Sequence, residues 1–148
     1  MKTLIDSSVI VASAISIHPL HPPCLHLMQR AREERGGFAV SQHGLGEVYS
    51  VLTRLPEPMR ILPALASQLV HELVEILEVV PLVPTDYLEA VSRLSAAGMA
   101  GRILFDMLHV IAAENAGCAR ILTDNERDFG RLPARKQLTI TGPESLQI

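Results

Sequence analysis

The alternation of short apolar runs with helix-like segments is the feature of this sequence that most restricts its fold. Strands that alternate with helices predict a parallel sheet covered by helices on both faces. The runs typical of strands are residues 3–12, 38–41, 78–84, 119–123 and 137–141. The segments with helical spacing are residues 24–35, 42–55, 63–77, 86–97 and 103–117. The first run is almost continuously apolar, as expected for a central strand buried on both faces.

Local signals refine this α/β pattern. Pro81 interrupts the run 78–84, which predicts either a strand at the edge of the sheet or a broken strand. The segment 124–133, DNERDFGRLP, is predicted to be a loop with room for one helical turn. No repeat, linker or low-complexity stretch divides the sequence, so we expect one domain over residues 1–148.

Composition restricts the class of protein and its surroundings. The chain has 148 residues, of which 48% are hydrophobic and 20% charged, an ordinary balance for a globular domain. A net charge of -3 argues against broad nucleic-acid binding, which needs a basic surface, but it leaves room for a local basic groove. No signal peptide is visible, and no apolar run reaches the ~18 residues of a membrane span. Cys24 and Cys118 stand alone, so we expect a soluble, cytoplasmic protein with reduced thiols and no membrane partner.

Four carboxylates in or beside apolar segments are the candidates for a catalytic site: Asp6, Glu47, Asp106 and Asp124. Ligands of parallel sheets bind beyond the carboxyl ends of the strands, and Asp124 comes directly after one. Taken singly, each acid also has an ordinary explanation in a turn or at a helix terminus. Gathered in one cleft, two carboxylates ~6 Å apart repel by about 3 kcal/mol at an effective dielectric constant of ~20. Such a site must take up protons or bind a cation.

The donor types indicate which cation. An all-oxygen set without a Cys or His ligand pattern favours a hard ion, Mg²⁺ or Mn²⁺. These ions serve phosphoryl chemistry, because they generate a hydroxide nucleophile and neutralise charge on the phosphate. The acids therefore predict a nuclease or a phosphatase.

Four motifs extend this interpretation: LIDSSVIV, GEVYSVLTRL, FDMLHVIAAENAG and RILTDNERDF. In order and spacing they resemble the motifs of PIN-domain ribonucleases, in particular VapC-type toxins of toxin–antitoxin pairs. The resemblance spans residues 3 to about 142. It implies a three-layer α/β/α PIN-like fold with a central, mostly parallel sheet, and Mg²⁺- or Mn²⁺-dependent cleavage of RNA phosphodiester bonds. It also implies a homodimer and a cognate antitoxin whose tail covers the acidic cleft.

The same resemblance implies roles for the acids. Asp6, Asp106 and Asp124 match positions that bind the metal, directly or through water. Glu47 matches the helical glutamate, which would orient or deprotonate the attacking water or complete the shell of the ion. Together these four residues are the expected catalytic set.

Neighbouring polar residues match supporting positions. Ser8 and Thr123 correspond to small polar residues that support the acids and the metal. The fourth acid is open at this point, because Asn125 or Asp128 could share or take the role of Asp124.

Basic residues and histidines offer further candidates. His109, three residues after Asp106, is either a hydrogen-bonded core residue or a ligand at the cleft. Two basic clusters suit bidentate phosphate contacts, or form solvated surfaces. They are Arg127, Arg131, Arg135 and Lys136 beside the last acid, and Arg30, Arg32 and Arg35 along the first helix.

Two rival interpretations come from other functional classes. A phosphatase of the haloacid-dehalogenase type needs D-x-D, whereas Asp6 is followed by Ser7 and Ser8. A non-catalytic PIN-like module that binds RNA or protein would keep the scaffold without cleaving. Such a module should have lost an acid, and all the expected positions are filled.

Overall fold

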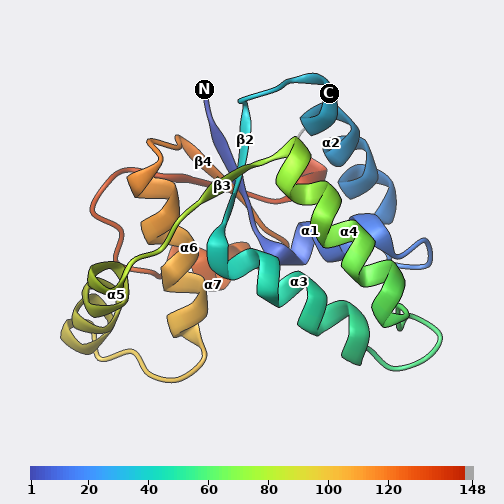
Figure 1. The fold of residues 1–148 in the computed structure, drawn as a ribbon. Coiled ribbons are helices and arrows are strands. Elements are labelled where there is room, and N and C mark those ends of the chain that lie inside the picture. The colour runs from blue at the N-terminus through green and yellow to red at the C-terminus, as the bar shows by residue number, and fades with distance from the viewer. Residues whose placement is uncertain (146–148) are drawn as a thin grey trace.

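The computed structural model of the chain describes residues 1–145 as a parallel sheet between two layers of helices (Figure 1). The strands are β1 (Thr3–Ile5), β2 (Phe38–Ser41), β3 (Glu78–Val80), β4 (Arg120–Leu122) and β5 (Thr139–Thr141). The helices are α1 (Ser7–Ala14), α2 (His21–Glu33), α3 (Gln42–Arg54), α4 (Pro63–Ile76), α5 (Pro84–Ala96), α6 (Ile103–Asn115) and α7 (Glu126–Gly130), followed by a short 3-10 turn (Pro143–Ser145). Residues 146–148 of the expected domain lie outside the described residues.

The five strands have the order β3-β2-β1-β4-β5, and every neighbouring pair is parallel. This confirms the predicted three-layer α/β/α fold and the edge position of the strand before Pro81. The order reverses at β1, because the chain first adds β2 and β3 on one side and then β4 and β5 on the other. Ligands of parallel sheets bind at such a reversal.

Successive strand residues point to opposite faces and supply two separate cores. Leu4 and Ile121 pack with α5, α6 and α7 on one face. Ile5 and Leu122 pack with α1, α2, α3 and α4 on the other. In Figure 1 the blue and green helices accordingly lie on one side of the sheet and the yellow and orange helices on the other. Both cysteines are buried and free, and burial raises the pKa of each thiol to about 11.

The predicted strand over residues 3–12 is wrong in its second half. The strand ends at Ile5, and residues Ser7–Ala14 form helix α1. Five of its eight residues are buried, so α1 lacks the polar face that reveals most helices in a sequence. A short apolar run does not by itself distinguish a strand from a buried helix. As a result, Asp6 lies at the exit of β1 and in the N-cap position of α1, not inside a strand.

A buried ion-pair network joins α5, α6 and the segment after α7. The Glu114 carboxylate accepts hydrogen bonds from the Arg93 guanidinium at 2.8 Å and from the Arg135 backbone N–H at 2.6 Å. Glu114 is 5% exposed. Burial acts to raise the pKa of Glu114, but the Arg93 hydrogen bond and the backbone donors outweigh it and lower the pKa.

Replacing Glu114 with glutamine should therefore lower the free energy of unfolding at pH 7 by about 2 kcal/mol, because the Arg93 guanidinium keeps only the partly exposed Glu89 as a charged partner. Since the folded-state pKa of Glu114 is depressed, its contribution is present above the unfolded-state pKa and is lost as pH falls through the folded value. Urea titrations at pH 7 and at pH 3 test both effects. The variant should lose less stability on acidification than the wild type, whereas Glu33→Gln, at an exposed position on α2, should behave as wild type.

Helices that could cross a membrane are absent from residues 1–145, since none is long and apolar enough.

Candidate active site

The carboxyl ends of β1 and β4 meet at Asp6. Its backbone N–H donates to the Leu122 carbonyl at 2.9 Å, which joins the two strand ends. The hydroxyls of Ser8 and Thr123 donate to Oδ2 of Asp6 at 2.7 and 2.8 Å. Asp6 is 4% exposed, so these bonds hold its carboxylate in one orientation and leave Oδ1 as the oxygen that faces the neighbouring elements. Ser8 and Thr123 thus contact the acid that the sequence predicted them to support.

Glu47 is brought to the same edge by α3, which begins directly after β2. The Ser41 hydroxyl caps α3 by accepting from the Gly44 N–H at 3.0 Å. A Cβ at position 44 would lie 2.9 Å from a methyl group of Val40 and 3.6 Å from the His109 ring. Glycine therefore allows α3 to approach β2 and α6 closely, and this approach places Glu47 beside the buried histidine.

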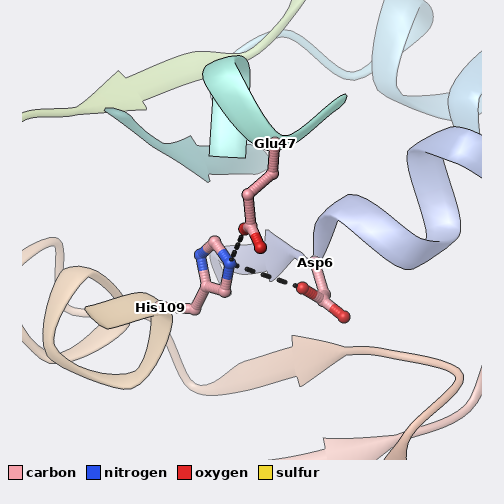
Figure 2. A group of neighbouring side chains, drawn as sticks. All are labelled: Asp6, Glu47 and His109. Atoms are coloured by element: carbon pink, nitrogen blue, oxygen red, sulfur yellow. Dashed lines mark hydrogen bonds and ion pairs between the residues drawn. The ribbon is translucent and has the colours of Figure 1, made fainter. Parts of the chain in front are cut away.

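His109 of α6 contacts both acids and lies below Glu47 and to the left of Asp6 in Figure 2. Its Nε2 lies 2.5 Å from Oε1 of Glu47 and 3.6 Å from Oδ1 of Asp6, while Nδ1 lies 2.7 Å from the Ser41 hydroxyl. Because ionised carboxylates only accept, Nε2 carries a hydrogen and donates it to Glu47. His109 is thus a hydrogen-bonded core residue and at the same time part of the site, which the sequence had presented as alternatives.

The ionisation of this pair follows from its surroundings. His109 is completely buried, which acts to lower its pKa, but the Glu47 hydrogen bond and the charge of Asp6 outweigh burial and raise the pKa. Burial acts to raise the pKa of Glu47, and the hydrogen bond and charge of His109 lower it overall. The geometry therefore favours an ionised Glu47 carboxylate bonded to His109.

Asp106, in the first turn of α6, completes the group of acids. Together with Asp6, Ser8, Asp124 and Asn125 it lines a hollow of about 370 Å³, called the acidic cleft here. Burial raises the pKa of Asp106 to about 6, and the negative charge of Asp6 adds to the effect. Burial first and the neighbouring carboxylates second thus favour the neutral form of Asp106.

Asp124 and Asp128 reach the site from different sides. Asp124 is exposed in the wall of the acidic cleft, and its backbone N–H donates to the Ser8 hydroxyl at 3.2 Å. Asp128, in α7, lines a second hollow with Glu47 and Asp106, and its charge contributes to the raised pKa of Asp106. The Asn125 side chain donates to Asp128 at 3.0 Å. All the predicted site residues therefore lie at this edge, but Asp124 and Asp128 do not line the same hollow.

The predicted basic clusters mostly lie away from the acids. Arg30 and Arg32 form ion pairs with Glu34 and Glu72 at 2.8 and 3.0 Å. Arg135 pairs with Glu89, and only Arg131 lines the hollow of Glu47. The structure adds Arg102, which the sequence argument missed although it stands four positions before Asp106.

The donors at this edge suit a hard divalent cation. Asp6, Glu47 and Asp106 supply carboxylate oxygens, the ligands that Mg²⁺ and Mn²⁺ prefer. Within residues 1–145, none of these three acids forms an ion pair with Lys or Arg. One carboxylate oxygen of Asp6, one of Glu47 and one ring nitrogen of His109 lie within 4.8 Å of one another. The residues therefore fit a bound cation, which would relieve the repulsion between these acids.

Both the sequence and the fold are similar to those of known proteins. Residues 3–134 match the PIN domain family. The fold is similar to a chain of VapBC2 from Rickettsia felis bound to promoter DNA (TM-score 0.66, 18% identity, 96% of this chain and 98% of that chain covered). It is also similar to VapC20 of Mycobacterium tuberculosis, a toxin that cleaves the sarcin-ricin loop (TM-score 0.70, 13% identity, 89% and 97% covered).

A third similar structure is a chain of DNA-bound VapBC from Salmonella typhimurium, with a TM-score of 0.67, 18% identity, and 97% and 98% of the two chains covered. No curated protein sequence matches the chain. At these identities the similar structures bear on the fold, whereas the family match bears on the sequence itself and spans most of the chain. The chain belongs to the PIN domain family.

Proposed function

We propose that the chain is a metal-dependent endoribonuclease that hydrolyses RNA phosphodiester bonds, and that it is the toxin of a VapBC-type pair. The observation that carries the proposal is the convergence of Asp6, Glu47 and Asp106 at one sheet edge of a PIN domain, without a basic partner from Lys or Arg. Such a group of acids destabilises the chain unless a cation or protons compensate it.

In this proposal Asp6 and Asp106 hold the metal, and Asp124 or Asp128 completes the set. A bound Mg²⁺ or Mn²⁺ would supply a Lewis acid and an activated water. Ser8 and Thr123 fix Oδ2 of Asp6, so Oδ1, which accepts one 3.5 Å hydrogen bond from Ser7, is the oxygen that would act as a ligand.

Glu47 has a different role, because its Oε1 is occupied by His109. Its second oxygen remains available to orient or deprotonate the water that attacks the phosphorus atom. Since the carboxylate is one quarter exposed, it can reach a water that enters from solvent.

The proposed partners are RNA, a cognate antitoxin and a second copy of the chain, all in the cytoplasm. Apolar side chains are exposed on α4 and α5, among them Leu65 (54% exposed), Leu88 (67%) and Val91 (53%). This surface is apolar area that the two cores of the domain do not use. The likeness of the fold to chains of VapBC complexes supports an antitoxin as one of the proteins that cover it.

A cleavage assay on total RNA tests the proposal. Fragments should appear with Mg²⁺ or Mn²⁺ and should disappear when a chelator is added. The Asp106→Asn variant serves as the matched control, since it removes one acid and keeps the shape of the side chain. Intact RNA under all conditions, on total RNA and on isolated transfer and ribosomal RNA, would favour the non-catalytic binding module.

Cation binding should also stabilise the fold, because a ligand that binds only the folded state raises its stability. At a Mn²⁺ concentration 100 times the dissociation constant, the gain is about 2.7 kcal/mol. For a chain of this size the melting temperature should rise by about 5–10 °C. Thermal melts with and without Mn²⁺ measure the shift, and the Asp6→Asn variant should not show it. An equal shift in both proteins would place the cation elsewhere.

A further inference from the structure

Two aromatic rings lie beside the acidic cleft in positions that the proposed chemistry does not use. The rings of His43 (first turn of α3) and Phe105 (first turn of α6) are parallel within 7°, with centroids 4.9 Å apart. Both line a hollow of about 280 Å³, called the side hollow here, of which Glu47 also forms part of the wall. Phe105 in addition lines the second hollow, next to Asp106. A half-buried ring thus stands directly beside the acids.

Two arginines line the same side hollow. Arg54 lies in the last turn of α3, and Arg102 immediately precedes α6. Both are exposed, and neither makes an ion pair or a side-chain hydrogen bond with any described residue. By contrast, most other arginines of the chain bind a carboxylate or a carbonyl. On a chain with a net charge of -3, this is a local positive site next to a negative cleft.

We propose that the side hollow is a nucleotide subsite, in which an unstacked base of the RNA lies on Phe105 while Arg54 and Arg102 bind the adjoining phosphates. This inference rests on the proposed function, because it concerns the substrate of the same cleft. Bases of single-stranded RNA stack on Phe and His side chains, and arginine binds phosphate in a bidentate manner. A flat ring and two unpaired guanidinium groups in one hollow match that ligand.

The inference selects a class of RNA. A base inside a duplex is stacked on both sides and cannot enter a hollow beside the cleft without being extruded. The segment that is cut should therefore be single-stranded or looped, with an unpaired nucleotide next to the scissile phosphate.

The position of the hollow suits this role. Phe105 immediately precedes Asp106, and Glu47 and Arg102 line both the side hollow and the second hollow. A nucleotide held there would therefore lie beside Glu47, which forms part of the wall of the side hollow. The side hollow would thus set the register of the RNA chain across the cleft.

Binding of a labelled single-stranded oligoribonucleotide, measured by fluorescence anisotropy in the presence of a chelator, tests the subsite without cleavage. Phe105→Leu should weaken binding about 5- to 100-fold, the loss expected for one stacked base, and Phe105→Trp should restore it. Arg102→Gln should also weaken binding and should reduce the slope of log K against log salt by ~0.7, whereas Phe105→Leu should leave the slope unchanged.

Two control variants distinguish a loss of RNA affinity at the subsite from a general loss of folded structure. Tyr87→Leu removes an exposed ring at the other end of α5 and α6, where Asn115 contacts Asp86. Arg35→Gln removes a guanidinium group that precedes β2, at the amino end of that strand, whereas the acids lie at the carboxyl ends of the strands. Neither should change RNA affinity.

If Phe105→Leu fails to fold, Gly46→Glu tests the same hollow, because a Cβ at Gly46 has no heavy atom within 4 Å. Its charge should weaken binding, and Gly46→Ala should not.

Wild-type affinity in Phe105→Leu, or equal binding of a matched duplex by the wild type, would overturn the inference. The KM and kcat of RNA cleavage with Mg²⁺ distinguish the subsite proposal from the nuclease proposal. The subsite variants should raise KM and leave kcat within about twofold. Cleavage with an unchanged KM in Phe105→Leu would retain the nuclease and reject the subsite. Loss of binding in a chain that cuts no RNA would retain the subsite and reject the nuclease.

Discussion

Replacing Asp6 with asparagine is expected to lower the rate of RNA cleavage by about 1,000-fold, the scale of loss when a group that stabilises developing charge is removed. Asp6 lies at the point where β1 and β4 meet, and its Oδ2 is already held by Ser8 and Thr123. The substitution therefore removes the charge of Oδ1 while the amide oxygen can still accept these two hydrogen bonds. Initial rates on a defined single-stranded RNA, at fixed Mg²⁺, measure the effect.

The stability of the same variant separates a functional from a structural role for Asp6. Without a cation, Asp6→Asn should be as stable as the wild type or slightly more stable, because it relieves repulsion with Glu47 and Asp106. Thermal melts in the presence of a chelator provide this comparison. A variant that loses both activity and several kcal/mol of stability would show that Asp6 is needed for folding.

The two candidates for the fourth acid can be compared in the same assay. Asp124→Asn and Asp128→Asn remove charges from different hollows, both of which contain Asp106. The residue that completes the metal set should show the larger loss of rate and the larger rise in the Mg²⁺ concentration needed for half-maximal rate. Equal and small losses in both variants would limit the metal set to Asp6 and Asp106.

Replacing His109 with leucine is expected to lower the free energy of unfolding by about 3 kcal/mol in the absence of a divalent cation. His109 is the donor between Asp6 and Glu47, whose oxygens lie within 4.8 Å of each other and of its Nε2. Two carboxylates at that separation repel by about 3 kcal/mol at an effective dielectric constant of ~20. Leucine fills much of the space but leaves both charges without the imidazole.

Urea unfolding with and without Mn²⁺ measures this contribution. Because a cation can replace the missing positive group, Mn²⁺ should stabilise His109→Leu more than it stabilises the wild type. His43→Leu is the matched control, since His43 lies 4.0 Å from Glu47 and is partly exposed. It should cost much less. If His109→Leu is destabilised and Mn²⁺ recovers none of the loss, the histidine contributes through packing alone.

Activity should fall in His109→Leu as well, through Glu47. Without the bond to Nε2, the Glu47 side chain gains rotational freedom and no longer holds its second oxygen in one position. We expect kcat to fall by about 10- to 100-fold, as for residues that orient a group of the site. The Ser41→Ala variant, which removes the bond to Nδ1 and keeps the bond to Glu47, should fall by less.

Several features of this fold were predictable because they are local. The spacing of apolar residues in α3 and the alternation of strands and helices follow from short-range periodicity, and the sheet is parallel as predicted. The prediction for residues 3–12 was wrong because α1 is buried on most of its surface and so lacks that periodicity. The same burial hid the real position of Asp6 at the end of a strand.

The sequence by itself determined the types of residue at the site, namely acids in or beside apolar segments. Only the tertiary structure decided which of them share a hollow and which donor lies between them. The packing of β2, α3 and α6 brings Ser41, Gly44 and Glu47 to His109. Glu47 and His109 are nevertheless 62 positions apart in the sequence. The physical reason is that a hydrogen bond or a charge interaction depends on separation in space, and separation along the chain carries almost no information about it.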